Sequence, residues 1–373
     1  AAANLDAILV SSRHNARYLL GGYRFFFFAY MDAVGSSRYL PVVLYLRGRP
    51  EDTAYFGNVM EKFEVENGSI WCPRITTSGW NSDEAIAGAI DQLRAAGGAI
   101  RRIGIERPFL PVDSHDQLLA GLPGVTLAEA GPVLQELRAC KSAQELDLMT
   151  RSADGVCDSM LATFGRLKAG MSKHDAVAIL KEEQTRRGLE FEYCLITAGT
   201  SLNRAPSDQR LQAGDIISLD SGANFRGYIG DICRMGILGE PDGELQDYLA
   251  RIDSVQQAAR DACRPGATGR QIYQAAEQAI AAAALATPIE FVAHGMGLVS
   301  HEAPQLTSSG DVRYKADYED KAIRSGMVLS IETTIRHPRR GFIKLEDAVY
   351  VTEDGHRAIG DGGRGWNRIP GAA

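Results

Sequence analysis

The chain has 373 residues, a length that favours two domains because single hydrophobic cores usually stop growing before that size. Its 45% hydrophobic and 23% charged residues are ordinary for a folded protein, and a net charge of -7 argues against nucleic acid and anionic membranes as partners. No apolar run approaches the ~20 residues of a membrane helix and the six cysteines form no C-x-x-C pair, so we expect a cytoplasmic protein in a reducing compartment with small-molecule partners.

Residues 1–135 are expected to form a small α/β domain. Apolar runs predict three short strands, at 5–10, 41–47 and 103–106. Apolar spacing predicts a helix at 83–96 and the start of another at 113–119, with Asp113 or Ser114 as its cap. Strands that alternate with helices favour a layered α/β arrangement.

The segment from Tyr23 to Tyr30 reads YRFFFFAY and is unusually rich in aromatic residues. Because aromatic runs usually lie in the core, we expect a buried strand or a contact between subunits here. A lid over a pocket, or a wall contributed across a homodimer, is the alternative.

The character of the chain changes near Gly131, and we place the domain boundary within 131–141, with the second domain over 136–373. Ser142 and Glu145 have the spacing of a capping box, which predicts a helix reaching about residue 167. Further helices are expected at 172–187, 243–263 and 268–286, and strands at 191–198, 289–293, 327–335 and 342–352. This order is typical of a mixed α+β domain.

The stretch from Asp215 to Gly236 is expected to form two strands joined by a Gly-rich turn at 221–230. Asp220 and Asp231 each lie near the end of an apolar run, so such a hairpin would bring both carboxylates to one place. Like charges repel at short distance unless a cation or shared protons compensate. The hairpin therefore indicates a site that needs a positive charge.

Three further segments place a charged or imidazole side chain beside an apolar run; they contain His294 and His301, Glu332, and Glu346. Taken singly, each has an ordinary explanation as a solvated carboxylate or a structural histidine. Taken together, four carboxylates and one imidazole on apolar strands are costly to bury without a cation. Such ligands suit Mn, Fe, Co or Zn, and the carboxylates could bridge two ions about 3.5 to 4 Å apart.

The order of these residues resembles the pita-bread metallopeptidases, a family that includes aminopeptidase P, prolidase, methionine aminopeptidase and creatinase-like enzymes. The matching features are Asp220 and Asp231 with ten residues between them, HGMGLVSHEAP at 294–304, Ile-Glu at 331–332 and Glu-Asp at 346–347. NARYL at 15–19, followed by Gly-Gly-Tyr, resembles the N-terminal domain of the aminopeptidase P, prolidase and creatinase branch. The resemblance implies a C-terminal pita-bread catalytic domain, a smaller N-terminal α/β domain and a homodimer.

The resemblance also implies a role for each matched residue. Two divalent ions, with Mn as the first expectation, would be bound by Asp220, Asp231, His294, Glu332 and Glu346. A water shared by both ions would be the nucleophile, because cations make hydroxide available near neutral pH. Glu332 would shuttle its proton, and His301 would hold the substrate or stabilise charge in the transition state. Arg234 is expected to be structural.

Two positions depart from the family's pattern. Many peptidase members have a His 17 residues before the first metal-binding Asp, where this chain has Asn203, which can donate a hydrogen bond but carries no positive charge. Lys344 stands where many members have Arg, and it keeps the charge but loses the bidentate fork. We assign substrate-binding roles to His301, Asn203 and Lys344, and the departures bear on the substrate rather than on the metal centre.

The expected function is the hydrolysis of an Xaa-Pro dipeptide or a similar small amide. The alternatives are a C-N hydrolase of the creatinase or ectoine-hydrolase type, a C-S lyase acting on dimethylsulfoniopropionate, and a binding protein without turnover. The segment RHPRR at 336–340 is expected to be a solvated hairpin tip, or else an anchor for an anionic substrate.

Overall fold

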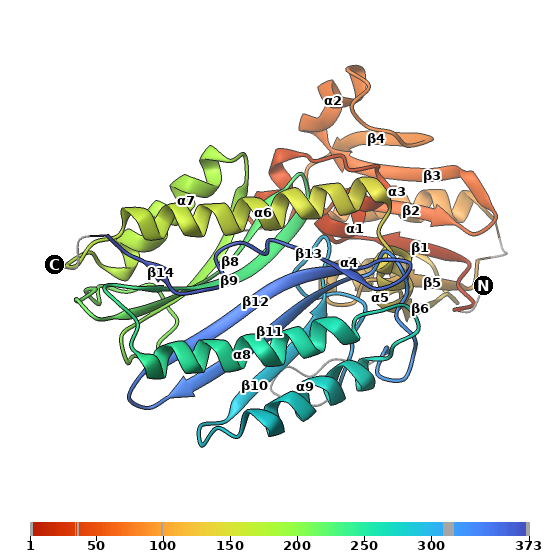
Figure 1. Cartoon of the computed structure of the whole chain (residues 1–373). Coiled ribbons are helices and arrows are strands. Elements are labelled where there is room, and N and C mark those ends of the chain that lie inside the picture. Colours follow the sequence, from red (N-terminus) through yellow and green to blue (C-terminus); the bar gives the residue numbers. More distant parts are fainter. Residues whose placement is uncertain (1–2, 34, 36, 98–99, 309–316, 371–373) are drawn as a thin grey trace. The chain divides into compact units, whose positions relative to one another are not determined.

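The computed structural model describes residues 3–33, 35, 37–97, 100–308 and 317–370 (Figure 1). The chain folds as two compact units, Ala1–Leu137 and Arg138–Ala373. Each unit has a sheet and a hydrophobic core of its own. A smaller α/β unit followed by a larger α+β unit is the fold class that the sequence predicts. Within the described residues, no helix combines the length and apolar character needed to cross a membrane.

The first unit is built on a six-stranded sheet in the order β4-β3-β2-β1-β5-β6. Its strands are β1 (Ala7–Val10), β2 (Val42–Leu46), β3 (Arg49–Asn58), β4 (Arg74–Gly79), β5 (Arg102–Ile105) and β6 (Thr126–Glu129). The helices are α1 (Arg13–Leu19), α2 (Lys62–Glu66), α3 (Ser82–Ala95), α4 (Val112–Gly121) and α5 (Gly131–Ala139), with 3-10 turns at Phe26–Tyr30 and Val59–Glu61. The three predicted strands are confirmed as β1, β2 and β5.

Two expectations for this unit are wrong. Phe26–Tyr30 is a 3-10 helix rather than a strand, and its period of about three residues buries Phe25 and Phe28 while Phe26 remains exposed. Helix α4 begins after Pro111, and no side chain caps it, so neither of the two predicted caps is used. A proline with its fixed φ beside the first turn can start a helix without a side-chain acceptor.

The second unit contains an eight-stranded sheet with the main order β10-β11-β12-β9-β8-β7. Its strands are β7 (Glu190–Ala198), β8 (Ile216–Phe225), β9 (Tyr228–Ile237), β10 (Ile289–Gly295), β11 (Val328–His337), β12 (Gly341–Val351), β13 (His356–Ile359) and β14 (Asn367–Arg368). The helices are α6 (Ala143–Arg166), α7 (Lys173–Arg186), α8 (Gly243–Ala262) and α9 (Gly269–Ala283).

The long helices of this unit pack along the sheet (Figure 1). Helix α6 packs on β8 and β9, and α8 packs on β11 and β12 with α9 beside it. The predicted capping box at the start of α6 is confirmed, since Ser142 N donates to Glu145 Oε2 over 2.7 Å and Glu145 N donates to Ser142 Oγ over 3.3 Å. Apolar residues of the strands, such as Ile331 and Leu345, face the helices and leave the other face to polar side chains.

The predicted hairpin is confirmed as β8 and β9, and it turns at Arg226 and Gly227, both with positive φ; the turn lies inside the predicted range 221–230, which was too wide. The strands continue through the glycines, because these positions serve close packing rather than turning. A Cβ at Gly222 would lie 2.5 Å from the Tyr193 ring, and one at Gly230 would lie 2.7 Å from a backbone nitrogen of α6. Both carboxylates of the hairpin therefore lie within the ladder.

Candidate metal centre

The register of the sheet aligns the candidate ligands in a row on one face. Asp220 pairs with Cys233, Cys233 pairs with Glu346, and Glu346 pairs with Glu332. Directly opposed residues of neighbouring strands share a face, so these carboxylates project to the same side of the sheet. Asp231 lies two residues from Cys233 on β9, and His294 lies two residues from Val292, the β10 partner of Glu332. Period-two alternation therefore places both on that side as well.

The same face lines a cavity of about 450 Å³. Most of its walls come from alternate residues of β7, β10, β11 and β12; β8 and β9 contribute one carboxylate each, and the rest comes from two loops. The lining residues are Tyr193, Leu195, Arg204, Asp220, Asp231, Glu290, Val292, Ser300, His301, Glu332, Thr334, Arg336, Phe342, Lys344 and Glu346. The cavity therefore combines a charged floor with apolar wall positions.

Three overlapping groups of ligand atoms lie close enough to share a cation. In each group the atoms are within 4.8 Å of one another; the groups are Asp231, His294 and His301; His294, Glu332 and Glu346; and Asp220, Asp231 and Glu346. The Nε2 atom of His294 lies 3.2 Å from Glu332 Oε1 and 3.9 Å from Glu346 Oε1. The structure thus brings together all five residues that the resemblance assigns to metal binding; their role as ligands remains a prediction.

Several buried atoms of this group lack a hydrogen-bond partner. Among the described residues, Asp231 Oδ1 and His294 Nε2 are buried without a hydrogen bond, and Glu346 Oε2 has only its ion pair with Lys344 Nζ at 2.7 Å. Buried polar atoms are normally paired, and unpaired carboxylate oxygens beside an imidazole nitrogen are what a divalent cation requires. The residues therefore fit the metal that the resemblance implies.

The electrostatics of the cluster are those of crowded negative charges. Burial and the neighbouring charge of Asp220 raise the pKa of Asp231 to about 6. Burial and repulsion from Asp231 raise the pKa of Glu346 well above its usual value. Burial opposes the charge of Glu332 too, yet Lys344 and His294 lower the pKa of this carboxyl overall. A bound cation would relieve the repulsion that these shifts record.

Two cationic side chains reach into the same group. The Lys344 ammonium contacts Asp220, Glu332 and Glu346 at 2.6 to 2.7 Å. Although burial opposes its charge, attraction to these carboxylates raises the pKa of Lys344 well above its usual value. Arg204 makes an ion pair with Asp220, and its guanidinium lies over the Phe342 ring, 5.0 Å from the centroid.

Arg204 is a residue that the sequence did not single out. The side chain of Asn203, the position of interest in the sequence, is exposed and accepts a hydrogen bond from Ala205 N over 3.0 Å. Asn203 is absent from the cavity lining, whereas Arg204 is part of it. The sequence did point to this loop, since Arg204 directly follows Asn203. In a loop without regular periodicity, however, spacing does not tell which neighbour faces the site.

His301 lies on the loop after β10, and its ring stacks on that of His294 with the centroids 3.8 Å apart and the planes 18° apart. The loop is held by Glu302, whose buried carboxylate accepts from Arg138 Nη1 over 2.7 Å and from Lys141 Nζ over 3.0 Å. A Cβ at Gly297 would lie 2.3 Å from Glu302 Oε1, so this glycine admits the carboxylate. The loop thus places His301 at the cavity.

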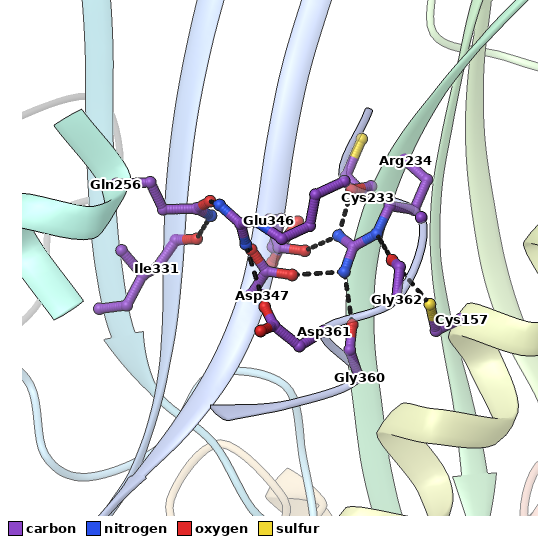
Figure 2. Close-up of polar contacts among 12 residues, drawn as sticks. Cys157, Cys233, Arg234, Gln256, Ile331, Glu346, Asp347, Gly360, Asp361 and Gly362 are labelled. Atoms are coloured by element: carbon purple, nitrogen blue, oxygen red, sulfur yellow. Dashed lines mark hydrogen bonds and ion pairs between the residues drawn. The ribbon is translucent and has the colours of Figure 1, made fainter. Parts of the chain in front are cut away.

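Arg234 follows Cys233 on β9, so strand alternation turns its side chain to the face opposite the ligands. Its guanidinium donates to the carboxylate of Asp347 and to the carbonyls of Cys233, Glu346, Gly360 and Gly362 (Figure 2). Asp347 also pairs with Arg364. The Arg234 and Asp347 side chains are fully buried, and this network ties the strands that carry Asp231 and Glu346 to each other from behind, in agreement with a structural role for Arg234.

Comparison with known proteins adds two family models. The model described as "Metallopeptidase family M24" matches residues 147–353, and "Creatinase/Prolidase N-terminal domain" matches residues 1–140. Among curated relatives, the "Probable dipeptidase PepE" of Mycobacterium tuberculosis is 32% identical over 252 residues, 65% of this chain and 64% of PepE. The match to that relative thus spans less than two thirds of its length.

Other relatives match over almost the whole chain. The "Xaa-Pro dipeptidase" of Pyrococcus horikoshii is 22% identical over 368 residues, 95% of this chain and 93% of that protein. Among solved structures, an "Xaa-Pro dipeptidase from Bacillus anthracis" has a TM-score of 0.80 at 20% identity, covering 99% of this chain and 96% of the other. The prolidase from Pyrococcus horikoshii has a TM-score of 0.77 at 20% identity, covering 96% and 95%. At this identity the structures show that the fold is shared.

Proposed function

Because this chain belongs to metallopeptidase family M24, whose model matches more than half of it, we propose that it is a metal-dependent hydrolase that cleaves an amide bond in a small substrate. The observation that carries the proposal is the row of four carboxylates and one imidazole on one face of the sheet, with buried ligand atoms left unpaired. An Xaa-Pro dipeptide is the first candidate substrate, since relatives named Xaa-Pro dipeptidase match nearly the full chain.

A divalent cation bound in this cluster would polarise the scissile carbonyl and lower the pKa of water at the site. The donor set suits Mn, with Fe, Co or Zn as alternatives. The resemblance implies two ions, and Asp231 and Glu346 would be shared between them. The Lys344 ammonium lies among the same carboxylates. The proposed hydrolysis therefore does not depend on whether one or two ions bind.

Glu332 is the candidate for moving a proton. Its side chain is 15% exposed, whereas those of Asp220 and Glu346 are 3% and 2% exposed. A proton carrier must reach both the reacting group and water, and Glu332 has this access to the cavity while it lies 3.2 Å from His294. The more buried Asp220 and Glu346 would therefore leave the proton transfer to Glu332.

The cavity sets limits on the substrate. Its volume of about 450 Å³ falls at the small end of ligand pockets, which suits a dipeptide or a compound of similar size. Arg204 and Arg336 line it, and Arg336 also pairs with Glu290 at 2.9 Å. These cations would orient an anionic group, while Val292 and Phe342 offer apolar contact. His301 is the proposed hydrogen-bonding partner of the substrate.

The test uses two ligand variants, Asp231→Ala and Glu346→Ala, with Asp247→Ala on the exposed face of α8 as the matched control. Both ligand variants should lose bound metal and activity, because each removes an oxygen donor from the shared part of the cluster. Metal content is measured by elemental analysis, and activity on Xaa-Pro dipeptides. The control should retain both properties. Ligand variants that keep their metal and their activity would contradict the proposal.

A small non-peptide substrate is the second candidate, favoured by Arg204 and Lys344 beside Asp220. A panel that sets Xaa-Pro dipeptides against cyclic amides and zwitterionic compounds separates a peptidase from a C-N hydrolase and from a C-S lyase. Activity on the dipeptides alone selects the first candidate. A protein that takes up no metal would instead be a binding protein without turnover.

A further inference from the structure

The Lys344 ammonium is surrounded by three of the five candidate ligands. Its Nζ lies 2.6 Å from Asp220 Oδ2, 2.6 Å from Glu332 Oε2 and 2.7 Å from Glu346 Oε2. An ammonium group has three N–H donors, so each carboxylate can take one of them. The side chain is 5% exposed, which leaves water little access to the group. Lys344 thus stands in a position where a cation is coordinated by carboxylates.

We infer that the Lys344 ammonium takes the place of one of the two divalent ions, so that this chain holds a single ion at the Asp231 and His294 side of the cluster. The inference rests on the proposed function, since it concerns the same ligands. It replaces the expected pair of ions by one ion and one built-in positive charge.

The positions of the unpaired atoms support a single place for an ion. Asp231 Oδ1 and His294 Nε2 are buried without a hydrogen-bond partner among the described residues. Both residues belong to one group whose ligand atoms lie within 4.8 Å of one another. Asp220, at the other end of the row, is instead contacted by Lys344 and by Arg204. Capacity to bind a further cation therefore remains mainly at Asp231 and His294.

The formal charges of the cluster also indicate one divalent ion. Four carboxylates carry four negative charges, and Lys344 and Arg204 supply two positive charges, so two negative charges remain. One divalent ion balances them. A second ion would leave two excess positive charges in a buried site unless Lys344 withdrew, and uncompensated buried charge is strongly unfavourable.

The strand itself holds Lys344 at this place. Lys344 lies two residues before Glu346 on β12, so both side chains project to the same face, and its pairing partner on β11 is Thr334. Arg204, stacked over Phe342, closes the cluster beside it. An ammonium leaving the group would have to give up three charge-assisted contacts in a buried cavity.

The experiment counts ions per chain. The wild type, Lys344→Ala, Arg204→Gln and the exposed control Lys62→Ala are loaded with excess Mn²⁺, freed of unbound metal by gel filtration and measured by elemental analysis. We expect about one ion per chain in the wild type and in both the Arg204 and Lys62 variants, and about two in Lys344→Ala, where the ammonium no longer occupies a coordination position. Arg204→Gln removes a positive charge from the cluster without emptying the position of the Lys344 ammonium, so it shows whether loss of charge alone raises the number of bound ions.

A spectroscopic measurement on the wild type keeps the test independent of whether the variant folds. Electron paramagnetic resonance of the Mn²⁺-loaded wild type should show the resolved hyperfine pattern of an isolated Mn²⁺, whereas a close pair of ions gives an exchange-coupled spectrum. Two ions per wild-type chain, or a coupled spectrum, would overturn this inference and leave the proposed hydrolysis intact. An unchanged count of one in folded Lys344→Ala would also overturn it. A wild type that binds no ion would overturn the proposed function as well.

Discussion

Each unit of this protein buries carboxylates, and the two units treat them in opposite ways. In the first unit, Glu106 is buried and accepts hydrogen bonds from Ser11 N, Ser12 N, Ser12 Oγ and Asn15 Nδ2 over 2.5 to 2.9 Å. In the second unit, Asp231 and Glu346 are equally buried, yet within the part of the chain that the structure describes Asp231 Oδ1 has no hydrogen bond and Glu346 Oε2 has only its ion pair with Lys344. Four donors surround the first carboxylate, whereas the second pair lies among other carboxylates with few donors, of which Lys344 and Ser330 contact Glu346.

Burial of a charged group is therefore a weak sign of function, while burial without hydrogen-bond donors is a strong one. Glu61 makes the same point, since the hydroxyls of Tyr23, Tyr39 and Tyr55 all donate to it. A carboxylate with such partners is already stabilised and leaves no reason for a ligand. The cluster at Asp231 is incomplete by the same measure. Four measurements would test this contrast between the two units.

Asp347→Ala should cause the largest loss of stability. Asp347 is fully buried and neutralises Arg234, so its removal leaves that guanidinium buried with its carbonyl acceptors but without its opposite charge. Breaking a buried pair in this way costs about 3 to 5 kcal/mol. Urea denaturation of the wild type and the variant measures the change, with Asp247→Ala as the exposed control. A loss of unfolding free energy no larger than that of the control would mean that the Asp347 charge does not stabilise the face of the sheet opposite the ligands.

Mn²⁺ should stabilise the second unit of the wild type. Binding to the folded state alone adds about 2.7 kcal/mol when the free ion is at 100 times its dissociation constant. Asp231→Asn should show little of this gain, because it weakens the oxygen donor beside His294. Hydrogen exchange of β8 and β9 with and without Mn²⁺ checks the result, and the strands of the first unit serve as the internal control. Equal protection in both units would remove the contrast between them.

Glu106→Gln should destabilise the first unit whether or not metal is present. The amide of Gln cannot accept from all the donors around it, and its own NH₂ group would face Asn15 Nδ2. Leaving a buried donor unpaired costs roughly 1 to 3 kcal/mol. Hydrogen exchange in β1 and α1 should increase, and added Mn²⁺ should not reverse it. If Mn²⁺ restored the protection of β1 and α1, metal binding in the second unit would stabilise the first unit too, which contradicts the contrast between Glu106 and the metal cluster.

Glu61 should give the smallest effect, seen as a pH dependence. Burial raises the pKa of this carboxyl above its usual value despite the hydrogen bonds from Tyr55 and Tyr39. The folded state therefore binds the proton more tightly than the unfolded state, and this contribution to stability is lost as pH rises through the raised pKa. The wild type should gain stability relative to Glu61→Gln as pH falls from 7 towards 5. Urea denaturation of both proteins at several pH values measures the difference, and a constant difference would contradict the prediction.

Much of this fold could be predicted from local chemistry. Ser142 and Glu145 mark a helix start because their hydrogen bonds are closed within four residues. The turn of the hairpin could not be found in the same way, because Gly222 and Gly230 serve contacts with Tyr193 and α6 that only the folded chain creates. Glycine in a sequence indicates either a turn or a close approach, and here the second applied.

The candidate site could likewise be predicted only in part, where the features depend on local spacing and not on tertiary packing. Spacing and strand alternation are enough to place Lys344 on the same face as Glu346, since the two are separated by one residue. That the ammonium reaches three carboxylates at once depends on how β8, β11 and β12 pair, which the sequence of any one strand does not contain. Arg204 was missed for a related reason, because its loop follows no repeating pattern.

The adjacent residues Glu346 and Asp347 are separated by a single peptide bond, and they serve opposite sides of β12. One faces the cavity, and the other meets Arg234 behind the sheet (Figure 2). Inserting or deleting one residue earlier in the strand would exchange their faces, which sends the shorter carboxylate to the cavity and the longer one into the packed network. Evolution can therefore vary this strand by substitution but hardly by length, since the insertion or deletion of one residue would remove both the catalytic cluster and the buried network that stabilises the sheet.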